Sequence, residues 1–104
     1  MVMDIEALNK MLRDGQDNLL LRFAIAQALF KENKFGDAIP HLEKALEHDN
    51  THTASLKLLG KAYAANGKNG KAMEAYRKGI AIAEEQGDIQ AAKEMQVFLK
   101  RLMK

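Results

Sequence analysis

The feature that most constrains this 104-residue chain is a segment that repeats after 34 residues. At this offset five residues coincide with identical ones and several more with similar ones; the identical pairs are Ala28 and Ala62, Lys34 and Lys68, Gly36 and Gly70, Ala38 and Ala72, and Lys44 and Lys78. Periods of about 20 to 50 residues are typical of proteins that stack copies of one supersecondary unit. The chain is therefore expected to be a small repeat protein.

Each unit is predicted to contain two helices. Alanine, leucine, lysine and glutamate are abundant and proline occurs once, at position 40, which favours helices over strands. Asn33 and Gly67 stand at equivalent positions, and both residue types tolerate the left-handed conformation that ends a helix. The predicted helices are 18–32 and 36–48 in the first unit, and 52–66 and 70–86 in the second. Pro40 is expected near the first turn of its helix, where few backbone bonds are lost.

The ends of the chain continue this pattern as half-units. Residues 4–13 are predicted to form a lone N-terminal helix, and residues 88–103 a final helix with Asp88 as its N-cap. We therefore expect one domain over residues 1–104, with repeat 1 at 19–52 and repeat 2 at 53–86. At the 34-residue offset Lys93 and Glu94 replace Leu59 and Gly60, so the last helix is interpreted as an atypical capping helix.

The second unit resembles the tetratricopeptide repeat family, in its small free-standing bacterial form. The signature residues stand at the family's spacing, and they are Leu56, Leu59, Gly60, Tyr63, Gly67, Ala72, Tyr76 and Gly79. The first unit matches less well, because Arg22 replaces the usual large apolar residue. The resemblance implies an all-α fold in which α-α repeats form a right-handed superhelix, and it implies an adaptor or scaffold that binds other proteins.

The sequence does not point to an enzyme. No nucleophile with a base, carboxylate pair or phosphate-binding loop is found, cysteine is absent, and His41, His48 and His52 lack supporting metal ligands at a useful spacing. We expect no catalytic residues, cofactor or metal. The start Met1-Val2-Met3-Asp4 lacks a basic region and an apolar run, and no segment is apolar enough to span a membrane, so a cytoplasmic protein with no membrane partner is expected.

The resemblance implies that a partner protein or peptide binds the concave wall built from the first helix of each unit. Seven candidate residues map to this wall, namely Leu20, Phe23, Gln27, Phe30, Lys57, Leu58 and Lys61. Phe23 and Phe30 are seven residues apart on one helical stripe, either open for a ligand or buried under a terminal helix. Six basic residues and one acid between Lys57 and Lys78 favour an acidic partner or a solvated helix surface.

Three other kinds of partner fit the sequence less well. The clamp that binds chaperone tails in this family is not matched, because Lys61 and Ala92 stand where asparagines are needed. Self-association as a homo-oligomer is the main alternative, since two units leave exposed ends that a second copy could cover. Nucleic acid is the least favoured partner, because acidic residues nearly balance the basic ones and the net charge is only +2.

Overall fold

The computed structural model describes residues 4–104 and shows six helices with no strand in that part of the chain. The expectation about a leader depends partly on Met1, Val2 and Met3, which lie outside the described residues. The helices are α1 (Ile5–Arg13), α2 (Leu19–Lys31), α3 (Phe35–His48), α4 (Thr53–Ala65), α5 (Asn69–Glu85) and α6 (Ile89–Leu102). None of these helices is both long and apolar enough to cross a membrane.

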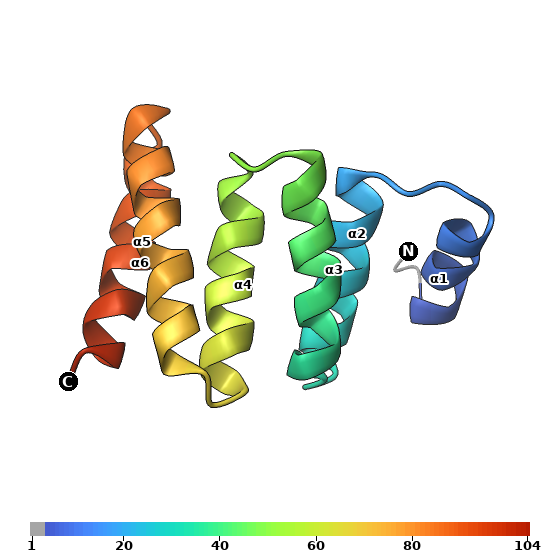
Figure 1. The fold of residues 1–104 in the computed structure, drawn as a ribbon, viewed down its shortest axis with the longest axis horizontal. Coiled ribbons are helices and arrows are strands. Elements are labelled where there is room, and N and C mark those ends of the chain that lie inside the picture. The colour runs from blue at the N-terminus through green and yellow to red at the C-terminus, as the bar shows by residue number, and fades with distance from the viewer. Residues whose placement is uncertain (1–3) are drawn as a thin grey trace.

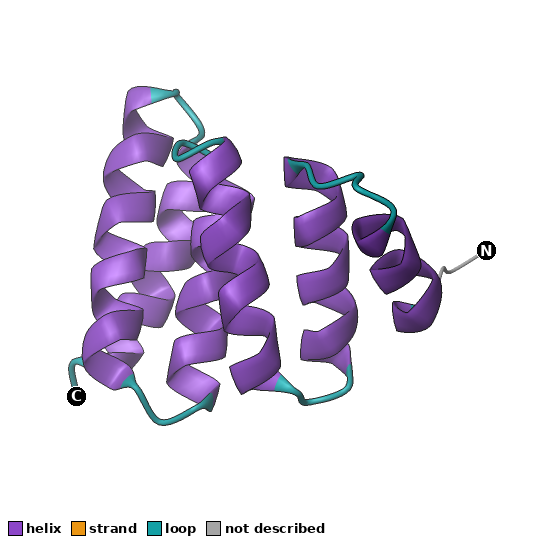
Figure 2. Ribbon diagram, turned by 45° about the vertical axis from the view of Figure 1, so that its right-hand side comes forward, coloured by secondary structure: helices purple, strands orange, loops and turns teal. Residues whose placement is uncertain are grey.

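The predicted all-α repeat fold is confirmed. Each helix packs against the next one along the chain, so that the six helices form a row from α1 at one end to α6 at the other (Figure 1). Short turns join them, and consecutive helices from α2 onward run in opposite directions (Figure 2). The core is a continuous cluster of apolar side chains shared by all six helices, with Ile25, Leu42 and Met95 wholly buried.

The first helix of each pair starts with a side-chain cap at an equivalent position. Asn18, His52 and Asp88 accept a hydrogen bond from the backbone N–H three residues later, at 2.9, 3.3 and 3.1 Å. Such a bond satisfies one of the N–H groups that a helix start leaves without a partner. These caps fix the starting points of α2, α4 and α6 and therefore their alignment across the row.

The predicted turn positions are confirmed by the backbone. Asn33 and Gly67 have positive φ angles of 61° and 79°, and Gly15 and Gly87 adopt the same region with 90° and 76°. After α4, the Lys68 N–H donates to the Tyr63 carbonyl at 2.8 Å, which closes the helix end. Four helices thus end in the same way, and their residues with positive φ are the ones that allow the sharp reversal.

Two glycines allow close contact between helices. A Cβ atom on Gly60 of α4 would overlap the Tyr76 ring of α5, and one on Gly79 of α5 would overlap the Met95 side chain of α6. Tyr76 and Met95 are 2% and 0% exposed, so neither has free space to retreat into. The small residues of the repeat therefore set the spacing between neighbouring helices.

The last helix keeps the repeat pattern at an offset of 36 residues instead of 34. α5 has 17 residues whereas α3 has 14, so the cap of α6 at Asp88 follows the cap of α4 at His52 by 36 residues instead of 34. At 36 residues Ala92 and Met95, which are 3% and 0% exposed, take the places of Leu56 and Leu59.

The interpretation of Lys93 and Glu94 as departures from the signature is therefore wrong. Both residues fall at surface positions once the longer α5 is taken into account, and the buried positions of α6 are occupied by apolar side chains. Pro40 also lies deeper than expected, as the sixth residue of α3. It leaves the Gly36 carbonyl without a helical partner, but both residues are exposed, so water can bond to that carbonyl.

Candidate functional site

The first helices of the pairs, α2, α4 and α6, are neighbours, because α4 packs against both of the others. We call the surface that they share the A-helix face. It includes the seven residues predicted from the sequence, together with Glu94 and Phe98 of α6. The predicted residues differ in exposure. Leu20 is 72% exposed and Gln27 is also exposed. The other five are half-buried, namely Phe23, Phe30, Lys57, Leu58 and Lys61.

The two phenylalanines of α2 lie at the junction with α4. The rings of Phe23 and His52 pack nearly at right angles, with centroids 5.2 Å apart, and the ring of Phe30 lies 5.0 Å from that of Phe35 of α3. Neither of these aromatic contacts comes from a terminal helix, α1 or α6. Both rings keep part of their surface open, and they therefore contribute apolar area to the A-helix face.

Lys61 joins aromatic side chains from two helices on either side of it. Its Nζ atom lies 5.5 Å from the centre of the Phe30 ring of α2 and 5.6 Å from that of the Phe98 ring of α6. Both distances are within the range in which an ammonium group is attracted to the face of an aromatic ring. The lysine head group is therefore held between two rings, at the centre of the A-helix face.

The other predicted lysine has an acidic partner within the chain. Lys57 Nζ lies 3.1 Å from Glu94 Oε1, in an ion pair between α4 and α6 whose side chains are 33% and 44% exposed. Thr53, Ala54, Ala91 and other residues beside this pair line a shallow groove of about 360 Å³ between the N-terminal ends of the two helices. Much of the positive charge expected on this face is therefore already balanced.

The basic segment from Lys57 to Lys78 does not form one surface. Lys57 and Lys61 lie on the A-helix face, whereas Lys71 and Lys78 of α5 line a second groove of about 300 Å³ whose floor includes Leu46, Leu56 and Tyr63. In the same region the Tyr63 hydroxyl donates to Glu43 at 3.2 Å. The cations are thus divided between two sides of the repeat.

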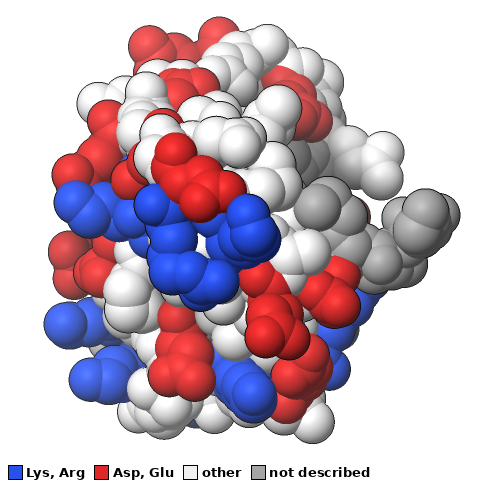
Figure 3. All heavy atoms as spheres, turned by 90° about the vertical axis from the view of Figure 1, so that its right-hand side faces the viewer, with Lys and Arg blue, Asp and Glu red and all other residues white. Residues whose placement is uncertain are grey.

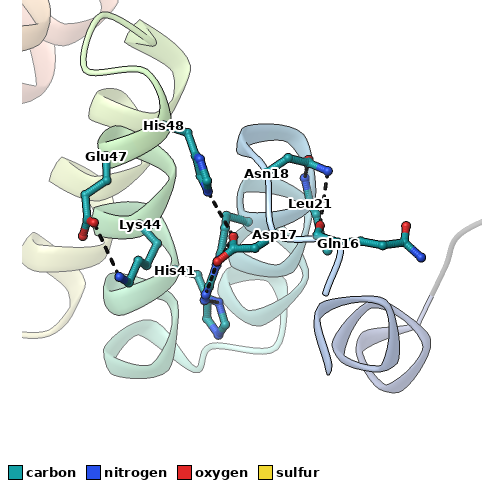
Figure 4. A network of polar contacts seen from close by, with 9 residues as sticks. Gln16, Asp17, Asn18, Leu21, His41, Lys44, Glu47 and His48 are labelled. Carbon is teal, nitrogen blue, oxygen red and sulfur yellow. Dashed lines mark hydrogen bonds and ion pairs between the residues drawn. The ribbon is translucent and has the colours of Figure 1, made fainter. Parts of the chain in front are cut away.

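A polar network replaces the missing large apolar residue of the first unit. Arg22, with a side chain 15% exposed, donates from Nε and Nη2 to the two carboxylate oxygens of Asp17 at 2.8 and 2.9 Å. Its Nη1 atom lies 3.0 Å from His41 Nδ1, and His48 Nε2 lies 3.0 Å from Asp17 Oδ1 (Figure 4). The network ties the turn before α2 to both helices of the first pair.

The surroundings of this network shift the pKa values of two of its members, Asp17 and His41. Hydrogen bonds from Arg22 and then from His48 hold the pKa of Asp17 well below its usual value. Burial lowers the pKa of His41, and the positive charge of Arg22 lowers it further. With His52 acting as a helix cap, each histidine has a structural role, and within residues 4–104 no three ligand-type side chains are grouped to hold a metal ion.

Sequence reasoning missed two members of the A-helix face, Glu94 and Phe98. Both lie on α6, where the 34-residue offset gave the wrong equivalences. A signal for the correct offset was present, since the helix caps His52 and Asp88 are 36 residues apart. Aligning the caps, instead of the interior residues, would have placed α6 correctly.

Comparison with known proteins agrees with this geometry. Residues 29–95 match the family model described as tetratricopeptide repeat. A TPR repeat-containing protein of Pseudomonas aeruginosa is 44% identical over 100 residues, which cover 96% of this chain and 95% of the relative. Members of this family generally serve as protein–protein interaction modules and use extended binding surfaces made by their stacked repeats.

Solved structures extend the comparison to the whole fold. The solution structure of a Bordetella parapertussis protein is 41% identical, with a TM-score of 0.85, covering 99% of this chain and 90% of that one. A tetratricopeptide repeat domain protein from Salinibacter ruber is 26% identical, with a TM-score of 0.74 and coverage of 81% and 85%. The repeat signature, the paired helices and these relatives together show that the chain belongs to the tetratricopeptide repeat family.

Proposed function

We propose that this protein binds a partner protein or peptide through the A-helix face. The observation that carries the proposal is the position of Lys61 between Phe30 and Phe98, which joins three helices into one surface of partly open aromatic rings. Aromatic side chains supply much of the binding energy in protein interfaces, because they bury a large area at a small entropic cost. The role is that of an adaptor and requires no catalytic group.

The chemistry of this face favours apolar side chains in the partner. Leu20 is 72% exposed at one side of the face, and Phe23, Phe30 and Phe98 each present part of a ring. Lys57 and Lys61 are already engaged with Glu94 and with the two phenylalanines. An acidic group of the partner would have to compete with Glu94 for Lys57, so acidic residues contribute less than apolar ones in this proposal.

The proposal is tested by capturing partners from a lysate of the source organism and comparing the wild type with a Leu20→Glu/Phe30→Ala variant. Leu20 is solvent-exposed, so its replacement costs little stability. Phe30 is half-buried, so helical circular dichroism must first show that the variant folds. We expect the captured protein to be lost or its affinity to fall by about tenfold or more, as is usual for an aromatic residue at the centre of an interface.

A matched control changes the opposite groove. Lys71→Glu/Lys78→Glu alters two residues on α5 and leaves the A-helix face intact, so capture should persist. If the control loses the partner while the Leu20→Glu/Phe30→Ala variant keeps it, binding takes place on the α3–α5 side and the assignment to the A-helix face is wrong.

A further inference from the structure

The outer side of α6 carries an exposed apolar strip at one end of the row. Ile89 and Val97 are 65% and 47% exposed, and with Gln90, Lys93 and Glu94 they line a shallow hollow of about 530 Å³. Ile89, Lys93 and Val97 are spaced by four residues and therefore share one side of the helix. This strip is separate from the rings at the centre of the A-helix face.

The strip stands where the next helix of the stack would pack. α4 reaches α6 through Lys57 and Lys61, which contact Glu94 and Phe98. At the 36-residue offset between these helices, the equivalents of the two lysines on α6 are Lys93 and Val97. The positions through which α4 contacts α6 are therefore exposed on α6 itself.

The charges along α6 are separated between its two ends. The last residues of α5, Glu84 and Glu85, and the N-cap Asp88 place three acids beside the start of α6. The last turn of α6 and the residues after it carry Lys100, Arg101 and Lys104. A helix of 14 residues is about 21 Å long, so the two groups are well apart. At the α1 end of the molecule, in contrast, acidic and basic side chains are interspersed (Figure 3).

We infer that a second copy of this chain covers the strip, with the two α6 helices antiparallel about a twofold axis between Lys93 and Glu94. This register places Lys93 opposite the partner's Glu94, and Gln90 opposite the partner's Val97, each twice because of the symmetry. It also sets the acidic start of each helix against the basic end of the other. A parallel arrangement would bring like charges together, so charge complementarity selects the antiparallel one.

The dimer is expected to be weak. One helix pair with two apolar residues per copy falls at the low end of the size range of specific interfaces, below about 1,200 Å² in total. The opposed charges are exposed, so raising the salt concentration from 50 to 500 mM should weaken the association. The inference does not rest on the proposed function, although Glu94 belongs to both surfaces, and the variants below leave Phe30, Lys61, Glu94 and Phe98 unchanged.

Sedimentation equilibrium of the full chain at low salt tests the inference with a pair of charge-reversed variants. One variant is Lys100→Glu/Lys104→Glu, and the other is Glu84→Lys/Glu85→Lys. Each variant alone opposes like charges at both ends of the helix pair, so its dimer dissociation constant should rise by about tenfold or more. Mixed together, the two variants regain opposite charges at both ends and should form a heterodimer at least as tight as the wild-type dimer.

Two controls accompany this experiment. Lys68→Glu/Lys78→Glu produces the same change in net charge as Lys100→Glu/Lys104→Glu but away from α6, so it should dimerise like the wild type. Val97→Glu should weaken the dimer strongly, because each copy then carries an extra charge in the surface that the two helices bury against each other. Circular dichroism confirms folding of every variant. A wild type that stays monomeric at millimolar concentration overturns the inference, and so does a mixture in which the reversed variants fail to associate.

Discussion

Asp17 and Arg22 form a two-pronged ion pair, with Nε–Oδ1 and Nη2–Oδ2 distances of 2.8 and 2.9 Å, that joins the turn after α1 to α2. The arginine occupies a position where this family usually has a large apolar residue. Its guanidinium group is mostly shielded from water and so depends on its partners, Asp17 and His41.

We expect Asp17→Asn to lower the thermal unfolding midpoint at pH 7, because it leaves the guanidinium group of Arg22 with only neutral partners. Adding Arg22→Leu should recover most of the loss, since it removes the unpaired, mostly shielded guanidinium group and restores an apolar side chain at that position. Thermal melts of the two single variants and the double variant measure this coupling. Losses that simply add would show that the pair does not act as a unit.

The pH dependence of stability should reveal His41. Its pKa in the folded protein lies below the usual 6.5, because burial and Arg22 oppose protonation. Below about pH 6.5 the unfolded chain therefore binds more protons at this residue than the folded chain does, and the free energy of unfolding falls as the pH drops toward the lower, folded pKa.

Urea unfolding from pH 7.5 to 5 measures this effect, with His41→Gln as the comparison. The free energy of unfolding of the wild type should decrease relative to that of the variant as the pH falls through this window. His48 and His52 are present in both proteins, so the comparison isolates His41. A constant difference across the window would contradict a role for His41.

Gly60→Ala should destabilise the protein, because the added methyl group meets the ring of Tyr76, which is 2% exposed and has no room to move. Overpacking of this kind usually costs about 1–3 kcal/mol. Gly70→Ala is the matched control, since nothing lies within 4 Å of its Cβ position, and alanine there should be neutral or stabilising by up to about 1 kcal/mol. Chemical denaturation distinguishes the two.

Replacing the left-handed residue should destabilise the turn after α4 clearly and the turn after α2 hardly at all. Gly67→Ala places a side chain at φ 79° and should cost about 1–2 kcal/mol. Asn33→Gly, at φ 61°, should change stability by only a few tenths of a kcal/mol, because the gain in backbone freedom offsets the relief of strain. Equal losses in the two urea unfolding curves would contradict this explanation of the turns.

The sequence by itself determined the architecture, because the relevant signals are local or periodic. The cap at Asp88 and the turn residues Asn33 and Gly67 each act within a few residues of where they stand, and the 34-residue period indicates that one helix pair is repeated. Helix positions follow from such signals, since capping and left-handed conformations depend on the residue type itself. The predicted helices accordingly agree with the observed ones to within a few residues.

Only the tertiary structure decided how the charged and aromatic side chains pair. Lys57 forms an ion pair with Glu94, which is 37 residues later in the chain, and Lys61 lies between rings from α2 and α6. These contacts depend on the register of α6. α5 is three residues longer than α3 and the turn after it is one residue shorter, so α6 is shifted by two residues relative to the earlier repeat. A period in the sequence fixes which residues are equivalent, but the length of each helix and the packing between helices decide which side chains meet.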